Sequence, residues 1–587
     1  MNAHPMNPDL DRLQAGLIAG LAAQITPGRG LHDPHSRQTT PPDHYGQTSA
    51  ALALAAHDRA LWPTARDAFD AWCAIDDAST GHLPFNRLLL RLLGRVAADT
   101  AVPTTEAAPI HTAAARCTLQ RRYPSNNWTL LAQTCRLIEA PERERAKRAR
   151  HLNGLLDRWT TTAGAFIDFP ERPGKRFSTP IAYHHKALFL AALAAWFHDD
   201  PALAHHAKRM LDWLVHCWDP AGYAGGLGRS NHALFGDGCL LGALILLGFD
   251  TDEPASPITA LARRLEGQRR PDGLLWLTPS GTESGDASWD GYMHLSVYNA
   301  WAAAVIAVAR HLRRHATHPH QDRALTWIGA AHGCFHDAEA GILYLRTSAG
   351  LNAMITTHGQ PPQSFSREEA DFRYSGGLIA HLSAHGVPLV APPVRCHRSQ
   401  LLATPALAGW TPVLQHRGAL YALTDFEQVT VDGDDSRVSI ALAGQPVALT
   451  RNPPRSLLQK IVGALDWRLL RGRIGRRASL DRPRLRSVSA TLSIVLSAND
   501  ATVSVDFRFD PLAAAELRLT NPGGHNLITT QSADGPWQTS PFGSSLPHAI
   551  GRCLANETTE SDQRPFRLRI RYSPAPDCTL ERGPAGT

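Results

Sequence analysis

A change in the spacing of apolar residues near Pro392 limits most strongly the folds open to this chain. Before that point apolar residues recur three and four positions apart, as Leu10, Leu13 and Leu17 do, which indicates helices that bury one face. After it, short runs alternate apolar and polar residues and are separated by Gly, Asp, Asn and Pro, which indicates strands. The chain therefore divides into a helical part and a strand part.

About a dozen helices are expected in the first part, joined by loops that carry Pro and Gly. They cover residues 10–21, 47–75, 87–98, 128–139, 142–161, 183–197, 201–217, 232–247, 257–268, 292–314, 322–334 and 374–385. Such helices can stack as hairpins around a central axis in an (α/α) toroid, and a solenoid is the alternative. We assign this part, as the expected catalytic domain, to residues 1–390.

The strand part, residues 391–587, is expected to form an antiparallel β-sandwich, because amphipathic strands must bury their apolar face against another layer. The expected strands cover residues 419–423, 429–431, 437–440, 447–450, 487–496, 502–509, 515–519 and 566–572. A helical insertion, residues 456–477, combines apolar residues at helical spacing with six basic residues. It can lie on an anionic membrane, bind an anionic polymer, or pack on the sandwich with its basic face in solvent.

Composition excludes several classes of protein. With 43% hydrophobic and 19% charged residues in 587, the chain is an ordinary globular protein, and no run approaches the ~18 apolar residues of a membrane span. The net charge of +6 suits an anionic partner but is far below that of a dedicated nucleic-acid binder. Nine scattered cysteines indicate neither a disulfide framework nor a zinc site. No signal peptide is visible, so we expect a cytoplasmic protein, or a periplasmic one if the start site omits a leader.

The most informative motif is Asn231-His232, where a glycine-rich loop meets an apolar helix. Glycines such as Gly228 free the backbone, and a helix start leaves amide hydrogens that can bind an anion such as a uronate carboxylate. The alternative is structural, with Asn231 capping the helix and His232 packed under the loop.

Two earlier clusters also open helices. Asn126, Asn127 and Trp128 offer two amides and an indole to a sugar, or else a helix cap and a core tryptophan. Tyr183 and His185 belong to a Tyr-His-His-Lys run, whose adjacent histidines point to different helix faces. Adjacent histidines are poor evidence for a metal, and we expect neither a metal nor a cofactor.

A fourth cluster contains Tyr292, His294 and Tyr298. His294 and Tyr298 are four residues apart and are therefore expected on one helical face. Tyr298 is a candidate for chemistry, although a tyrosine at helical spacing is also typical of a buried core.

The order of these motifs resembles that of the toroid polysaccharide lyases. The nearest are the alginate lyases, and the heparinase II/III and chondroitin/hyaluronate lyases are more distant kin. In the alginate lyases an Asn-His followed by a small-x-aromatic pattern lies at a helix start, and a catalytic tyrosine follows on a later helix. Asn231-His232 and Tyr298 match these positions, and the resemblance covers residues 126–314.

One feature departs from the family, which usually has an arginine shortly before the tyrosine. Here residues 291–297 contain only His294 in that role. Arg229, or Arg373 beside Tyr374, are the candidate replacements for recognising a carboxylate.

The resemblance implies β-elimination on a uronic-acid polysaccharide or oligosaccharide, and the residues suit it. Asn231, with Asn127, is the candidate neutraliser of the carboxylate, which stabilises the enolate-like charge that develops. His232 or His185 is the candidate base that removes the C5 proton, and Tyr298 is the candidate acid for O4. Tyr298 could also serve as the base if nearby cations lower its pKa from about 10.

Three alternatives stay open. A toroid glycoside hydrolase would need two carboxylates, for which Glu283, Asp286, Asp290 and Asp237 are available. A uronate C5-epimerase would use the lyase chemistry without expelling O4. A non-catalytic glycan-binding or assembly protein could be held at a membrane surface by residues 456–477.

Overall fold

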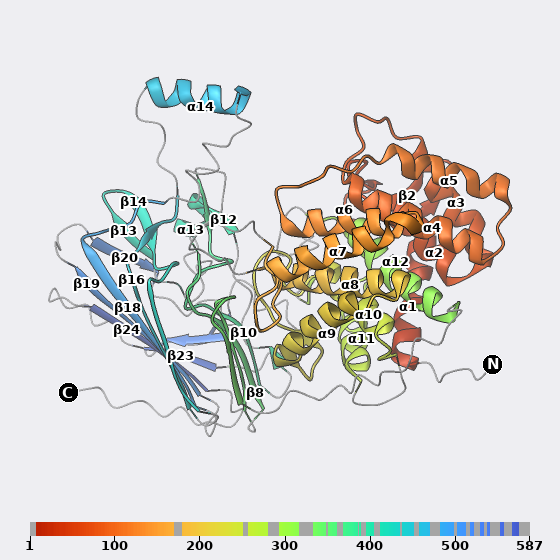
Figure 1. The fold of residues 1–587 in the computed structure, drawn as a ribbon. Coiled ribbons are helices and arrows are strands. Elements are labelled where there is room, and N and C mark those ends of the chain that lie inside the picture. Colours follow the sequence, from red (N-terminus) through yellow and green to blue (C-terminus); the bar gives the residue numbers. More distant parts are fainter. Residues whose placement is uncertain are drawn as a thin grey trace. The chain divides into compact units, whose positions relative to one another are not determined.

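Helices form the N-terminal unit of the computed structural model (Figure 1). The contacts between these helices close into a ring. The structure describes residues 7–168, 179–250, 256–279, 293–315, 333–347, 350–360, 368–384, 387–388, 395–403, 411, 413–434, 437–450, 457–469, 482–497, 502–511, 517–521, 529–532, 537–539, 552–556 and 566–573. The chain separates into a helical unit, residues 1–224 and 229–329, and a strand unit, residues 225–228 and 330–587.

Within the described residues, the inner layer of the ring contains six helices, in which each helix packs against the next and the last packs against the first. They are α2 (Gly46–His57), α4 (Leu83–Asp99), α6 (Asn126–Ile138), α8 (Ile181–His198), α10 (Leu234–Leu246) and α12 (Leu295–Arg314). The contact between α12 and α2 closes the ring, which is the arrangement of an (α/α) toroid and excludes an open solenoid.

Outer helices cover this ring, and each packs on an inner neighbour in the sequence. They are α1 (Pro8–Ala23), α3 (Trp62–Cys73), α5 (Thr104–Arg116), α7 (Glu142–Trp159), α9 (Pro201–His216) and α11 (Pro257–Glu266). A 3₁₀ turn, η1 (Arg59–Leu61), separates α2 from α3. Two small antiparallel sheets accompany the helices: β1 (Ile25–Thr26), β2 (Gly30–Asp33) and β3 (Gln38–Thr39), and β4 (Trp218–Asp219) with β5 (Tyr223–Ala224).

The two layers differ in sequence because they differ in burial. An inner helix has neighbours on all sides, and every residue of α10 is buried. A Cβ atom added at Gly238 of α10 would lie 2.7 Å from the Cα atom of Ala302 on α12, so glycine permits this close approach. An outer helix such as α7 buries one stripe and exposes the rest, as an amphipathic helix at a surface does.

Several expected helix boundaries move, and each has a local cause. A single helix was expected over residues 47–75, but the structure has two, α2 and α3. They are divided at Asp58, which has an extended backbone and whose side chain caps the 3₁₀ turn. Helix α5 was not expected, because its alanines and threonines give weak periodicity and Pro109 interrupts it. The helix expected over 374–385 is wrong, since Ile379–Ala384 forms a strand. Most of the expected helix 322–334 lies outside the described residues.

The strand unit contains antiparallel sheets. One has the strand order β11-β10-β8-β7-β6 and comprises β6 (Gly333–Asp337), β7 (Ile342–Arg346), β8 (Leu351–Thr356), β10 (Ile379–Ala384) and β11 (Val387–Pro388). It begins near residue 333, so the helical unit ends about 60 residues earlier than the expected boundary at 390. Its strands escaped notice because they are short and mostly buried on both faces, so they lack alternation.

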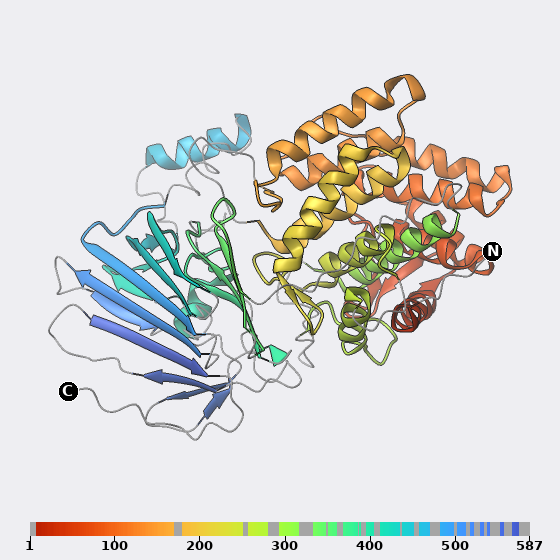
Figure 2. The ribbon, with the colours of Figure 1, turned by 60° about the horizontal axis from the view of Figure 1, so that its bottom comes forward.

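A larger sheet has the order β15-β16-β18-β19-β24-β23-β21-β22. Its members are β15 (Gln428–Gly433), β16 (Arg437–Gly444), β18 (Val488–Ser497), β19 (Thr502–Pro511), β21 (Thr529–Ser532), β22 (Trp537–Thr539), β23 (Arg552–Asn556) and β24 (Phe566–Ser573). Figure 2 shows its long strands side by side, and all its pairs are antiparallel except β21 with β23. Every strand expected after residue 392 overlaps an observed strand, whereas face-to-face packing of the sheets into a sandwich stays a prediction.

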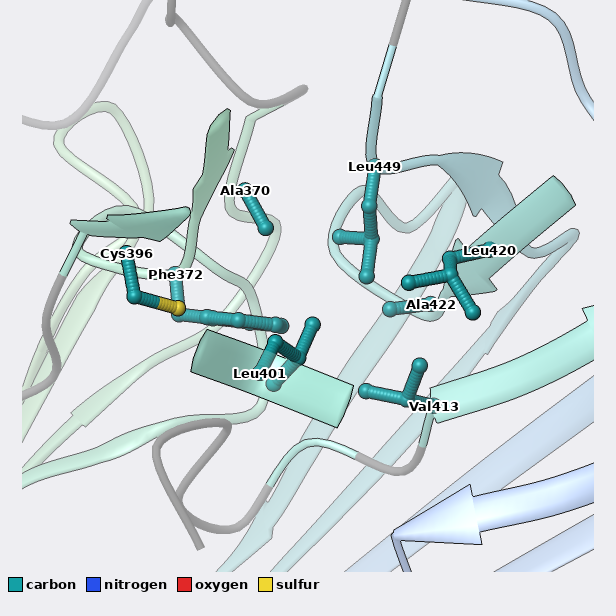
Figure 3. Packing of buried hydrophobic residues seen from close by; sticks show 8 residues of the cluster. All are labelled: Ala370, Phe372, Cys396, Leu401, Val413, Leu420, Ala422 and Leu449. Carbon is teal, nitrogen blue, oxygen red and sulfur yellow. The ribbon is translucent and has the colours of Figure 1, made fainter. Parts of the chain in front are cut away.

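A cluster of eight buried apolar side chains holds the smaller strands of this unit together (Figure 3). They come from β9 (Glu369–Asp371) and its neighbour Phe372, β12 (Arg395–His397), α13 (Arg398–Ala403), β13 (Val413–His416), β14 (Ala419–Ala422) and Leu449 after β17 (Val447–Ala448). Strand β20 (Leu517–Asn521) pairs with β13, and β9 pairs with β12. The last helix, α14 (Leu457–Leu469), falls in the expected basic insertion. No helix in the described part of the chain is long and apolar enough to cross a bilayer.

Candidate active site

The starts of the inner helices meet at one end of the ring, where their aromatic side chains touch. The ring contacts that link them, by centroid distance, are His44–His82 (4.2 Å), His82–Trp128 (5.1 Å), Phe85–Phe235 (6.4 Å), Tyr183–Phe235 (6.3 Å) and Phe235–Tyr298 (5.5 Å). These residues lie at or just before the starts of all the inner helices. The first turn of a helix carries partial positive charge, so this end of the ring favours an anion.

At two of these helix starts, a carboxylate from another segment accepts a hydrogen bond from a backbone nitrogen. Asp168 Oδ1 accepts a hydrogen bond from the backbone nitrogen of Asn127 (2.8 Å) at the start of α6. Asp33 Oδ2 accepts from the backbone nitrogen (2.8 Å) and the hydroxyl (2.7 Å) of Ser296 at the start of α12. Burial alone would raise the pKa of Asp33, but these and further hydrogen bonds lower it below its ordinary value. Asp33 therefore stays ionised and holds the β2–β3 hairpin against α12.

Three half-buried histidines form a cluster at this end. His44 stacks on His82 at 4.2 Å and meets His294 edge-on at 4.7 Å. Burial, followed by the charges of His82 and His294, lowers the pKa of His44 to about 4, and burial also lowers the pKa of His82. His44 is therefore a neutral imidazole near pH 7 and a weak base, whose free ring nitrogen can accept a hydrogen bond.

A buried polar network lies between α6 and α8. The Lys186 ammonium donates to Asn127 Oδ1 (2.9 Å), and Asn127 Nδ2 donates to Asp168 Oδ1 (2.6 Å). The Lys186 Nζ atom also lies 4.1 Å from the centroid of the Phe85 ring, a cation–π contact. Burial lowers the pKa of Lys186 to about 7 and raises the pKa of Asp168. Both amides expected here are thus engaged: Asn127 in this network, and Asn126 through its Nδ2, which donates to the Ile167 carbonyl (2.8 Å).

Asn231 and His232 lie in the loop before α10, not within the helix. The N-cap of α10 is Ala233, so Asn231 does not cap it, and the helix begins two residues later than expected. Asn231 is 5% exposed, and neither its Oδ1 nor its Nδ2 atom has a hydrogen-bond partner among the described residues. A buried amide without a partner is costly and rare, so a ligand that supplies the partner would explain it.

The backbone around this amide is in a conformation that side chains disfavour. Ser230 and His232 have φ angles of 59° and 46°, in the left-handed region, and so does His82 at 46° before α4. Three such residues in loops that precede inner helices mark a site where the surrounding structure imposes the backbone conformation.

His232 is half-buried, and its ring lies edge-on to Tyr223 at 5.0 Å. The Arg264 guanidinium lies 4.8 Å from the centroid of the Tyr223 ring and forms a buried ion pair with Asp237 (2.5 Å). Asp237, one of the carboxylates considered for hydrolysis, is thereby committed to Arg264. Burial raises its pKa, an effect that the Arg264 charge opposes.

Tyr298 lies in the first turn of α12 and is 6% exposed. Its ring packs on Phe235 of α10, four residues after Asn231 in the sequence. His294 is the N-cap of α12 and not part of the helix, and its carbonyl accepts from the Tyr298 backbone nitrogen (3.1 Å). The two residues thus meet at the start of α12, although His294 precedes the helix and does not lie on a helical face with Tyr298.

The adjacent histidines of α8 separate, as expected. His184 Nδ1 accepts from the Phe166 backbone nitrogen (3.1 Å), and Nε2 lies 3.0 Å from the Met210 carbonyl, so the neutral ring carries its proton on Nε2. His185 is 3% exposed, and burial lowers its pKa to about 3, which makes it a weak base near neutral pH. Tyr183 is half-buried and faces Phe235.

The candidate arginines lie in different units. Arg229 is an exposed residue of the helical unit, and its charge lowers the pKa of the buried Asp168, against the larger effect of burial. Arg373 and Tyr374 belong to the strand unit, where Arg373 forms a buried bidentate pair with Asp371 (2.9 and 2.8 Å). A guanidinium paired in this way with a carboxylate of its own unit stabilises that unit. Tyr292, Glu283, Asp286 and Asp290 lie outside the described residues.

Sequence reasoning overlooked His44, His82 and Asp168. His82 is the N-cap of an inner helix, as His294 is, and His44 lies one residue before the N-cap of another, so a comparison of all the helix starts could have found them. Asp168 carries no local signal, because its partner Asn127 is 41 residues away. No group of three or more His, Cys, Asp or Glu side chains in the described ranges is arranged to hold a metal ion.

No family model matches this chain, and no curated protein does. Solved structures of carbohydrate-processing enzymes are similar to about half of it. They include the GH76A alpha-1,6-mannanase of Salegentibacter sp. HEL1_6 (11% identity, 51% of this chain and 99% of that chain, TM-score 0.38). The unsaturated glucuronyl hydrolase of Streptococcus agalactiae has 12% identity over 53% of this chain and 93% of its own, with a TM-score of 0.37. A D-mannose isomerase has 10% identity over 51% and 97%, with a TM-score of 0.37. These three are hydrolases and an isomerase, and likenesses this weak assign no activity.

Proposed function

We propose that this chain is a polysaccharide lyase that cleaves a uronic-acid-containing glycan by β-elimination at the end of the helical ring. The observation that carries this proposal is the buried amide of Asn231, which has no hydrogen-bond partner among the described residues. An amide offers two N–H donors, and a buried donor pair aimed at an anion suits the carboxylate of a uronate.

The electrostatics of this end support an anionic substrate. Starts of the inner helices converge here, and the first turn of each helix carries partial positive charge. The network of Asn127, Lys186 and Asp168 is internally paired, so its role in the proposal is to fix α6 and α8. Asn231 is therefore the proposed neutraliser of the substrate carboxylate, and Asn127 is a positioning residue.

The proposed reaction moves one proton from C5 and returns one to O4. His232, half-buried beside Asn231, takes the C5 proton, since the low pKa of His185 makes that residue a poorer base. The C–H electron pair forms the C4=C5 double bond while the C4–O4 bond breaks. The Tyr298 hydroxyl gives its proton to O4. Solvent then takes the proton from His232 and returns one to Tyr298, which restores the starting state.

Glycoside hydrolysis is the second candidate, and Asp168 is the observation that favours it. This carboxyl is fully buried at the same end of the ring, and burial raises its pKa, as a general acid requires. A hydrolase needs a second carboxylate, and among the described residues considered for that role Asp237 is already paired with Arg264. Of the carboxylates considered from the sequence for this role, Glu283, Asp286 and Asp290 remain, and they lie outside the described residues.

One experiment separates the candidates. Purified protein is incubated with alginate, hyaluronan, heparan sulfate and polygalacturonate while ultraviolet absorbance and reducing ends are followed together. A lyase produces both signals, because each cleavage leaves a conjugated unsaturated uronate. Reducing ends without absorbance mean hydrolysis, and proton exchange at C5 without cleavage means epimerisation. Binding without any reaction would assign the chain as a glycan-binding protein and overturn the enzyme proposal.

Variants then test the assigned residues. We expect Asn231→Ala, His232→Ala and Tyr298→Phe each to remove most activity while the thermal melting curve stays close to that of the wild type. Asn153→Ala is the matched control, because Asn153 lies on outer helix α7 and its buried Oδ1 atom also lacks a partner. Full turnover by Tyr298→Phe would refute the role of that phenol.

A further inference from the structure

The apolar face of α14 is the most exposed apolar surface that the structure describes. Large apolar side chains that are exposed number six among the described residues, and five of these lie on α14. The five, with their exposed fractions, are Leu457 (76%), Leu458 (72%), Ile461 (50%), Val462 (40%) and Leu465 (49%). An exposed apolar cluster of this kind marks an interaction site.

These five side chains share one face of the helix. Their positions repeat with spacings of one, three, one and three residues, which places them in a single stripe at 3.6 residues per turn. Asp466, in the same helix, is 4% exposed, so its side of the helix is covered while the apolar stripe is not. The helix is therefore covered beside the stripe, at Asp466, and open along the stripe itself.

The sequence around this stripe carries almost all the net charge of the chain. Residues 456–477 contain six basic residues and one acidic residue, a net charge of +5, whereas the whole chain has 59 basic and 53 acidic residues, a net charge of +6. The remaining residues thus contribute 53 basic and 52 acidic side chains, a net charge of +1. A partner that fits this segment must be both apolar and anionic.

We propose that α14 docks on the surface of an anionic lipid bilayer. The five apolar side chains enter the boundary between head groups and acyl chains, and the net positive charge of the segment attracts the anionic head groups. Apolar insertion and attraction to anionic lipids act together in such helices, and each basic residue near the surface adds to binding. Long Lys and Arg side chains can extend along an apolar surface to keep their charges at the phosphates.

Charge favours a bilayer over a second copy of the chain. A symmetric dimer through α14 would bring two segments of +5 together, and like charges across an interface oppose association. A bilayer of anionic lipids instead offers many negative charges beside an apolar layer. This inference is independent of the activity of the helical unit.

The test is co-sedimentation of the full chain with vesicles of phosphatidylcholine alone, and with vesicles of phosphatidylcholine and phosphatidylglycerol in equal parts. We expect binding to the anionic vesicles only, and weaker binding as salt screens the charges. Ile461→Glu should weaken binding about tenfold or more, because it places a charge in the inserted face. Leu402→Glu is the matched control, since Leu402 is the remaining large exposed apolar side chain, 45% exposed, and lies on α13.

Thermal melting curves of both variants show whether each remains folded, and an exposed position predicts that it does. Equal binding to neutral and anionic vesicles, or equal loss in both variants, would overturn the proposal. So would a wild-type dimer in light scattering that Ile461→Glu dissociates while vesicles bind neither protein, since that result assigns the stripe to a second copy.

Discussion

The α6–α8 side of the candidate site and the loop before α10 differ in whether their buried polar side chains are hydrogen-bonded. Between α6 and α8, Asn127 links Lys186 to Asp168, and each side chain has a partner. Before α10, the Asn231 amide is equally buried and has no partner among the described residues. A paired buried amide contributes to folding, whereas an unpaired one costs stability until a ligand satisfies it. The first side thus stabilises the fold around the site, and the second is where we propose that the substrate binds.

The largest effect expected from this difference is on turnover. Asn231→Ala should reduce kcat/KM by about 10²–10³, the usual cost of losing a donor to developing negative charge. Its free energy of unfolding should equal or exceed that of the wild type, because an unsatisfied amide is removed. Activity comes from the ultraviolet assay and stability from urea denaturation. A large loss of stability would show that Asn231 belongs to the fold.

Asn127→Ala should show the opposite pattern. It leaves the Asp168 carboxyl and the Lys186 ammonium without their shared partner, so we expect a loss of about 2–4 kcal/mol in the free energy of unfolding. Urea denaturation of this variant beside Asn231→Ala makes the comparison direct. Equal stabilities of the two variants would remove the distinction between the two sides of the site.

Lys186→Met should change how the free energy of unfolding depends on pH. The folded pKa of about 7 lies below the ordinary value of 10.5, so between these values the unfolded chain binds more protons than the folded one. Burying this lysine therefore costs stability that is recovered as pH rises. Relative to Lys186→Met, the wild type should gain about 2 kcal/mol from pH 7 to pH 9. Parallel pH profiles for the two proteins would show that Lys186 is not a buried cation.

The smallest effect is expected from His184→Gln, which should change how the free energy of unfolding depends on pH in the acid range. Burial lowers the pKa of His184 to about 4, so the unfolded chain takes up a proton first as pH falls below about 6.5. The wild type should therefore lose about 1.5 kcal/mol more than the variant between pH 6.5 and pH 5. Urea denaturation at these two pH values measures the difference. An equal loss in both proteins would mean that His184 is protonated in the folded state.

How well each sequence-based hypothesis agrees with the structure depends on how far apart in the sequence the interacting residues lie. Asn231, His232 and Tyr298 could be selected because a loop followed by an apolar helix is visible locally. The sequence could not show whether Asn231 caps that helix, because the left-handed backbone at Ser230 and His232 decides where the helix begins. The engagement of Asn127 with Asp168 was equally hidden, because it joins residues 41 positions apart.

What the sequence alone determined is that helices come first and strands follow, that an apolar helix follows Asn231-His232, and that a basic apolar segment contains α14. These properties depend on residues a few positions apart, where periodicity and propensity act. Only the tertiary structure decided that α12 closes on α2, that the helix starts meet, and which buried amide is paired. Those outcomes depend on contacts between distant segments, and a pattern of neighbouring residues carries no information about them.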